Sequence, residues 1–314
     1  MRIFDSMRIN YNIAVLALMK QAKLSAASVV AQWIPLHLVE RMAGVMCLLA
    51  TRCSNEHRHA FAQRVETVQA ILGRTDVDAP RIRMTGILEK LLDIKVYFAD
   101  SVYGEWGSID RIAIQLQKRI VDMQARYPDQ PIVLSPFHYA SQYVNMLVCE
   151  RLRIRLGIDS LSVVSAVEDD VYGADVERIP HIKRLRSYLD GRQASLGVVR
   201  EMKRRGFVIL FADVPPATLS TTPMETVTVE LFGKQGRIHN GVFRLGEKMR
   251  ALLLPYYIKL SEGQFQLTMF DAIELEQKQA PQRLAVNIAQ AFIDNHAQWL
   301  PSNHPCFYYF SSSK

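Results

Sequence analysis

Hydrophobic positions follow a helical period in the first part of the chain. Up to about residue 126, apolar side chains recur every three or four residues, as in amphipathic helices. The predicted helices span 12–30, 36–51, 55–72, 80–100 and 108–126. The second has a continuous apolar face, which suits either a core helix or a helix at an interface. This face consists of Leu38, Met42, Val45, Met46 and Leu49.

A different pattern begins near residue 131, where short apolar runs alternate with amphipathic stretches. Strands are predicted at 132–134, 161–167, 207–212, 227–232, 251–260 and 264–270. Amphipathic segments are predicted at 143–156, 182–189, 196–205, 237–250 and 282–299. This alternation predicts an α/β fold, in which a helical N-terminal lead packs on a mixed, largely parallel sheet with helices on both faces. The segment YPDQP divides the lead (1–126) from the core (127–314), and the two can still pack as one domain.

Composition narrows the classes of partner. The 314 residues carry a net charge of +7, which favours an anionic partner such as nucleic acid, an acidic membrane surface or a phosphorylated substrate. Zinc-type spacing and aromatic residues among the basic clusters are both missing, so we expect no nucleic acid and no metal. Cys47, Cys53, Cys149 and Cys306 lack CxxC spacing and are expected to be reduced.

Hydropathy bears on localisation. The longest uncharged stretch, 24–39, is shorter than the roughly 20 residues that a spanning helix needs. The first residues lack the cleavage site of a secretory leader. We therefore expect a cytoplasmic protein, with peripheral contact to the inner membrane as an option.

Two polar residues end predicted strands at one edge of the sheet. His138 follows the strand at 132–134 and precedes a helix, and open α/β sheets place their chemistry at this edge. A neutral imidazole there can act as a general base toward a hydroxyl. Asp213 ends the strand at 207–212 and precedes a long Ser/Thr-containing loop, typical of a lid or binding loop. The alternative is that Asp213 only caps a turn.

A glycine-spaced basic segment lies further along the chain. Lys234, Arg237 and His239 precede a predicted helix, and backbone N–H groups at such a junction can bind an anion. The spacing of a Walker loop is missing. An ordinary solvated turn is the alternative.

Taken together, five blocks resemble the lipid A biosynthesis (late) acyltransferases of the lysophospholipid acyltransferase superfamily. They are WIPLHLVERMAGVMCLLATR, SPFHYASQY, RQASLGVVREMKRRGFVILFADVPP, VELFGKQGRIHNGVFRLGEKMRALLLPYYI and NHAQWLP. The resemblance implies a glycerol-3-phosphate acyltransferase-like fold and transfer of an acyl chain from acyl-carrier protein or acyl-CoA to a hydroxyl or amine, often on a lipid or glycolipid. No metal, cofactor or covalent acyl-enzyme is needed. It implies that His138 is the base and that Arg192, Lys234 and Arg237 contact anions. We add His239 to the candidate anion contacts because it lies in the same basic segment.

One position departs from the family's H-x-x-x-x-D/E motif, because Tyr143 stands where the acid is expected. The next carboxylate, Glu150, is about three helical turns from His138. Three interpretations stay open. Tyr143 orients the imidazole, a carboxylate such as Asp213 replaces the acid, or the fold now binds a lipid or carrier without catalysis. A soluble acyltransferase of secondary metabolism is a further alternative. The sequence leaves the acceptor, donor, chain length and oligomeric state open.

Overall fold

A computed structural model describes residues 34–98, 106–165, 182–186, 191–216 and 225–303 of the chain. The helix predicted at 12–30 lies outside these residues, as does most of the loop that follows Asp213.

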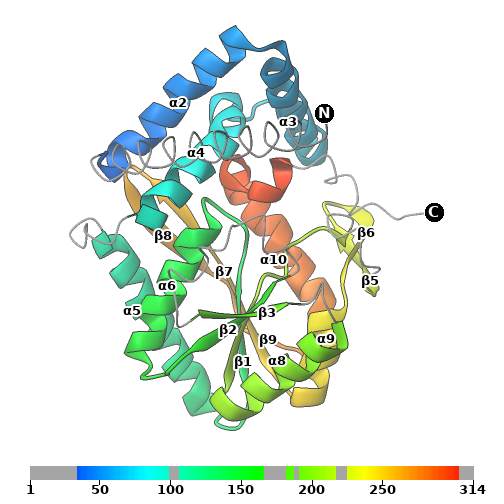
Figure 1. Cartoon of the computed structure of the whole chain (residues 1–314). Coiled ribbons are helices and arrows are strands. Elements are labelled where there is room, and N and C mark those ends of the chain that lie inside the picture. Colours follow the sequence, from blue (N-terminus) through cyan, green and yellow to red (C-terminus); the bar gives the residue numbers. More distant parts are fainter. Residues whose placement is uncertain (1–33, 99–105, 166–181, 187–190, 217–224, 304–314) are drawn as a thin grey trace, which may run out of the picture.

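A mostly parallel sheet forms the centre of the molecule (Figure 1). Its strands are β1 (Ile132–Pro136), β2 (Leu161–Ser165), β3 (Ile182–Arg186), β4 (Phe207–Leu210), β7 (Leu252–Ser261), β8 (Gln264–Met269) and β9 (Ile273–Glu274). The main order is β3-β2-β4-β1-β7-β8, and β9 pairs with β7. The first five strands in this order are parallel, whereas β8 and β9 run antiparallel to β7. The predicted α/β class is therefore confirmed.

Alternate residues of the central strands bury opposite faces of the sheet. Ile132 and Leu134 of β1 belong to one hydrophobic core, and Val133 between them belongs to the other. Helices α5 (Gly107–Arg126) and α6 (Gln142–Arg155) contribute to the first core. The second core includes side chains of α8 (Gly191–Arg205), α9 (Gly241–Met249) and α10 (Ala280–Asn295). Both faces of the sheet are thus covered, as expected for parallel strands.

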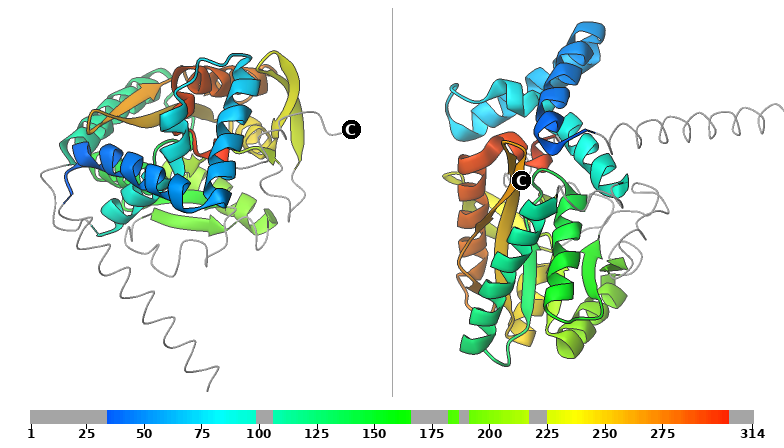
Figure 2. Two further views of the ribbon diagram at one scale, coloured as in Figure 1. Left: turned by 90° about the horizontal axis from the view of Figure 1, so that it is seen from above. Right: turned by 90° about the vertical axis from the view of Figure 1, so that its left-hand side faces the viewer.

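Three helices of the lead lie together beyond the carboxyl ends of the parallel strands (Figures 1 and 2). They are α2 (Leu36–Cys53), α3 (Asn55–Leu72) and α4 (Ala79–Phe98), and they match the predicted helices within a few residues. Helix α4 packs against α6 and against two short 3₁₀ helices, η4 (His296–Gln298) and η5 (Leu300–Asn303). The lead therefore borders the edge of the sheet where the candidate residues were expected. The division into two domains stays a prediction.

Two predicted segments have a different secondary structure. Residues 182–186 form the edge strand β3, not part of an amphipathic helix, because Ile182 and Leu185 pack into opposite cores of the sheet. The helix predicted from residue 237 begins at Gly241. The residues before it form β6 (Lys234–His239), which pairs antiparallel with β5 (Thr226–Leu231).

The turn of this hairpin explains why a strand replaces the expected helical start. Phe232 and Gly233 both have positive φ angles, 55° and 69°, the combination that a two-residue hairpin turn of type I′ requires. Gly236 pairs with Val229 inside the ladder. The glycines of the basic segment therefore serve a hairpin, and residues 234–239 form a strand where a loop leading into a helix was expected. Whether they contact an anion stays a prediction.

The apolar face predicted for α2 is largely turned outward. The residues that α2 buries are Leu36, Val39, Ala43 and Cys47. Leu38, Val45, Met46 and Leu49 of the predicted face are exposed. Helix α2 therefore packs on α4 and α3 through a different side than the one predicted.

Candidate active site

Backbone hydrogen bonds fix the segment that carries His138. Phe137 donates its N–H to the carbonyl of Tyr256 at 2.8 Å, which extends the pairing of β1 with β7. The carbonyl of His138 accepts the N–H of Leu300 at 2.8 Å. Ala140 has a φ of 55°, so the chain turns sharply before α6 begins. His138 therefore stands on a rigid turn at the carboxyl edge of the sheet.

Asp213 holds both the ring and the backbone of His138. Its Oδ1 lies 2.7 Å from His138 Nδ1, and its Oδ2 accepts the backbone N–H of His138 at 2.8 Å. The Asp213 side chain is fully buried, and that of His138 is 12% exposed. Because a carboxylate can only accept, this contact places the ring proton on Nδ1. In the described part of the chain, Nε2 has no hydrogen-bond partner, so its lone pair is available to a substrate.

Trp299 completes the environment of this carboxylate. Its indole N–H donates to Asp213 Oδ2 at 2.9 Å. Asp213 thus receives three N–H groups, which compensates the cost of burying its charge. The Trp299 ring is buried edge-on against Phe292, with centroids 5.3 Å apart. The sequence pointed to this tryptophan only through its block of resemblance and gave no reason to place it beside Asp213.

The neighbour of Trp299 ties this segment to the sheet. The Gln298 side chain accepts the N–H of Leu260 at 2.9 Å and donates to its carbonyl at 2.7 Å. The backbone carbonyl of Gln298 accepts the N–H of Ala140 at 3.1 Å. Residues near 138, 213 and 299 therefore form one hydrogen-bonded unit although they are far apart in sequence.

The topology explains why these segments meet. β1 and β4 are neighbours, but the chain leaving β1 crosses to β2 whereas the chain leaving β4 crosses to β7. The two outgoing connections take opposite faces of the sheet, because α6 after β1 packs in the first core and α9 after β4 packs in the second. Open α/β sheets bind ligands at such a switch point. His138 and Asp213 follow these two strands directly.

Helix α4 adds two partly buried acids, Asp93 and Glu89, near the dyad. Asp93 Oδ1 accepts the hydroxyl of Ser141 at 2.5 Å, and the Ser141 oxygen in turn accepts the N–H of Val144 at 3.1 Å, which caps α6. Burial raises the pKa of Asp93 to about 7. Burial also raises the pKa of Glu89, one turn earlier, while the positive charges of Arg64 and Lys90 oppose that rise. The contact from Asp93 couples the helical lead to the turn after His138.

We predict that protonated Asp93 makes stability depend on pH. Its pKa is about 7 in the folded chain against 3.8 as the ordinary value, so its contribution is fully present below pH 3.8 and is lost as the pH rises through about 7. The change Asp93→Asn mimics the protonated acid. From pH 5 to pH 8, the wild type is expected to lose on the order of 1–3 kcal/mol of unfolding free energy relative to this variant, as measured by urea denaturation. Parallel pH profiles for the two proteins would contradict the prediction.

Tyr143 lies in the first turn of α6, and its backbone N–H donates to the Asp93 carboxyl group. The imidazole nitrogen that an acid at this position would hold is bonded to Asp213. Of the three interpretations for the missing acid, the observed contact favours the carboxylate from elsewhere in the chain. That Tyr143 takes part in catalysis stays a prediction.

We expect Tyr143→Phe to change kcat by less than about threefold, because Asp213 already orients the base and stabilises its charged form. For the same reason, Tyr143→Glu is expected to bring no gain in rate. Steady-state release of thiol from the acyl donors that the resemblance implies measures both. A loss as large as that of Asp213→Asn would show that Tyr143 has a catalytic role of its own.

Among the candidate anion contacts whose side chains are described, Lys234, Arg237 and His239 form no hydrogen bond with the dyad. Lys234 is exposed, and Arg237 donates from Nε to the Thr226 hydroxyl at 2.7 Å. Burial lowers the pKa of His239 to about 4, and neither ring nitrogen has a hydrogen-bond partner in the described segments. Arg192 lies in the first turn of α8, but its side chain is outside the described residues. Their role toward a substrate stays a prediction.

Comparison with known proteins does not assign the chain to a family. No protein-family model matches the chain, and no curated protein matches it. Among the residues that the structure describes, no group of three or more His, Cys, Asp or Glu side chains is arranged to hold a metal ion. The function must therefore be argued from the dyad itself.

Proposed function

We propose that the chain is an acyltransferase, in which His138 takes the proton of a hydroxyl or amine acceptor while that acceptor attacks an acyl thioester. One observation carries the proposal: a buried carboxylate holds Nδ1 of a histidine whose side chain is 12% exposed, and Nε2 has no hydrogen-bond partner among the described residues. This arrangement suits a general base whose substrate comes from outside the chain.

The proposed mechanism needs one base and one leaving group. The acceptor oxygen or nitrogen forms a bond to the thioester carbonyl carbon as its proton passes to His138 Nε2. Asp213 stabilises the imidazolium that results, as the acid of a catalytic triad does. The C–S bond then breaks, and the imidazolium returns the proton to the departing thiolate. The dyad ends the cycle in its starting state.

The open Nε2 also favours direct transfer over a covalent intermediate. A serine or cysteine nucleophile must lie within hydrogen-bond reach of its base. No such side chain bonds to Nε2 within the described residues. The attacking group is therefore taken to belong to the acceptor.

The resemblance supports the choice of substrates. It favours acyl-carrier protein or acyl-CoA as the donor and a lipid or glycolipid as the acceptor. A net charge of +7 suits phosphate-bearing substrates. We assign Arg192, Lys234, Arg237 and His239 as candidate contacts for those anions, and a peripheral position at the membrane follows from a lipid acceptor.

The test is a direct search for product. The purified protein is incubated with acyl-carrier protein and with acyl-CoA of several chain lengths, each with lysophospholipid, glycolipid and small amine acceptors. Mass spectrometry detects the acylated acceptor, and free thiol is measured in parallel. The His138→Gln variant, handled identically, provides the blank.

Each outcome of this experiment decides between the candidate functions. Product from the wild type alone supports the proposal, and the acceptor used separates a lipid enzyme from one of secondary metabolism. Equal amounts of product from the wild type and the His138→Gln variant would show that His138 is not the general base. If the wild type binds acyl-carrier protein but releases no thiol with any acceptor, the chain is a carrier-binding protein instead.

A further inference from the structure

Arg64 of α3 is a buried cation that the proposed chemistry does not use. The residue is 8% exposed, and the Nε and Nη2 atoms of its guanidinium are buried without a hydrogen-bond partner in the described part of the chain. Burial lowers the pKa of Arg64 to about 10, so the side chain stays charged at neutral pH. A buried charge is costly unless a partner compensates it. The guanidinium therefore lacks a group that would offset its burial.

The contrast with Lys95 shows how this fold treats a buried cation that has a structural contact. Lys95 is 1% exposed, and its ammonium donates to the carbonyl of Ile34 at 2.7 Å. Neither buried nitrogen of Arg64 has such a bond, although Glu89 of α4 is the acid whose charge most favours the ionised arginine. The third nitrogen, Nη1, is not among those buried atoms, so a ligand from outside the chain can reach the guanidinium.

Helix α3 brings this arginine to the border of the candidate site. The helix packs on α4 and on η5. The first residue of η5, Leu300, donates its N–H to the carbonyl of His138. The helix that carries Arg64 is therefore in contact with the segment that anchors the proposed base.

One face of α4 lies against the segments that carry the dyad. At one end of this face, Thr85 donates its hydroxyl to the carbonyl of Ala297 at 2.5 Å. At the other end, Asp93 accepts the hydroxyl of Ser141. Residues four apart in a helix lie one above the other, so Glu89 is midway between these two contacts. The acid nearest in charge to the buried guanidinium therefore faces the turn that carries the base.

We propose that Arg64 binds an anionic group of the substrate, such as a phosphate. A planar guanidinium can donate from two nitrogens to one phosphate, which a lysine ammonium does not match. The phosphate belongs either to the acceptor or to the acyl donor, because coenzyme A and the phosphopantetheine of a carrier protein both carry phosphate. The substrate role rests on the proposed acyl transfer, whereas the binding of phosphate itself does not.

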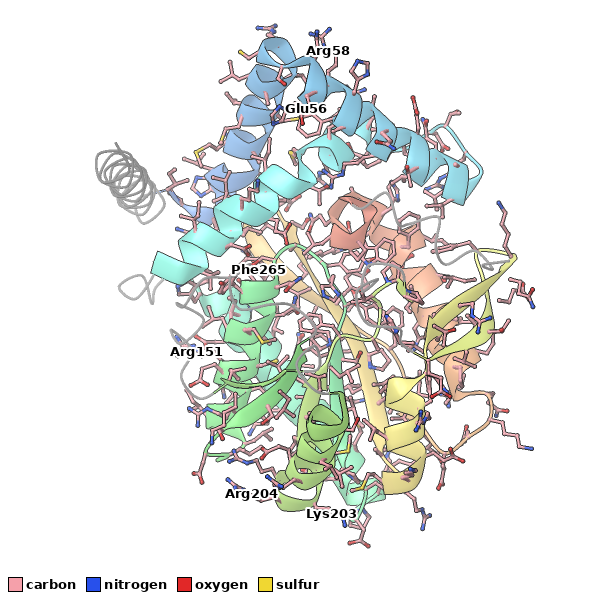
Figure 3. The ribbon with its side chains drawn as sticks, turned by 45° about the vertical axis from the view of Figure 1, so that its right-hand side comes forward. Glu56, Arg58, Arg151, Lys203, Arg204 and Phe265 are labelled. Atoms are coloured by element: carbon pink, nitrogen blue, oxygen red, sulfur yellow. The ribbon has the colours of Figure 1, made fainter. Side chains whose placement is uncertain are left out.

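The first experiment uses inorganic phosphate as the probe and needs no turnover. The full chain is unfolded by heat in sodium phosphate and in sodium chloride of the same ionic strength. The change Arg64→Met replaces the charge with an unbranched apolar side chain. The matched control, Arg58→Met, removes the same charge from an exposed position of the same helix, at the outer end of the lead (Figure 3).

We expect phosphate to raise the Tm of the wild type and of the control by about 2–4 °C, and that of Arg64→Met by less than about 1 °C. In chloride, Arg64→Met is expected to be at least as stable as the wild type, because it removes a buried charge without a partner. A wild type that does not respond to phosphate, or a variant that responds equally, would overturn the proposal. A variant that is less stable in chloride would also overturn it, since the guanidinium would then support the fold.

A second experiment identifies the source of the phosphate. Acyl-CoA is compared with the acyl thioester of N-acetylcysteamine, which lacks phosphate, and a phosphorylated acceptor is compared with its phosphate-free counterpart. Arg64→Met is expected to raise KM by about tenfold or more for the substrate whose phosphate it binds, with kcat within about threefold and the phosphate-free partner unaffected. Equal KM values of the wild type and the variant for every phosphorylated substrate would exclude the substrate role. A wild type without turnover would reject the acyl transfer, and the response to inorganic phosphate would still decide whether Arg64 binds an anion.

Discussion

The change His138→Gln is expected to lower kcat by about 10³–10⁴-fold, the upper range for removal of a general base. Glutamine can still donate an amide N–H toward Asp213, which keeps the buried carboxylate partnered and the fold intact. It has no group that can accept a proton at the position of Nε2. The measurement is the steady-state release of donor thiol, and a folded variant that keeps more than a tenth of the wild-type rate would contradict the assignment.

The change Asp213→Asn is expected to cost about as much, on the order of 10³–10⁴-fold in kcat, for a different reason. One oxygen of the carboxylate accepts the N–H groups of His138 and Trp299, and the other accepts the imidazole. An asparagine keeps a single acceptor oxygen. If it faces the two N–H groups, the amide NH₂ faces Nδ1 and forces the ring proton onto Nε2, where the base must be free. The comparable change in a serine-protease triad costs about 10⁴-fold.

The matched control for Asp213→Asn is Asp93→Asn, because Asp93 is also a largely buried acid that accepts hydrogen bonds near the site. The Asp93 variant is expected to keep kcat within about tenfold of the wild type, since Asp93 caps α6 and does not bond to the imidazole. Thermal unfolding of both variants shows whether activity is lost because the protein unfolds or because the ring proton of His138 moves to Nε2. If the two variants lose activity equally while folded, the role of Asp213 as the partner of the base is wrong.

The sequence was most informative where the local spacing of hydrophobic residues determines the secondary structure. The helices of the lead and most strands of the core follow from hydrophobic spacing, and Gly73 ends α3 with a φ of 63°, as a glycine helix stop does. Residues 182–186 were harder, because a short edge strand with polar side chains lacks a clear alternation. Whether the apolar face of α2 turns inward or outward depends on what packs against it, and spacing alone does not determine that.

The candidate site was predictable in part. Strand ends placed His138 and Asp213 at one edge, but their direct contact requires that β4 lie beside β1, and that order is a tertiary property. The place of Trp299 depends on the docking of a 3₁₀ segment and has no local signal. The basic residues of the hairpin were grouped by sequence proximity, and pairing in a ladder spreads such residues along a strand.

The bond from Trp299 to Asp213 means that the site is assembled in an order. A ribosome makes His138 and Asp213 well before Trp299, and domains fold as their residues emerge. Until the segment around Gln298 docks on β7, the carboxylate lacks one of its three donors and the turn at Ala140 lacks its anchor. A growing chain, or one cleaved after α10, therefore holds an incomplete base. The proposed base is therefore complete only in molecules that have been made and folded through this segment.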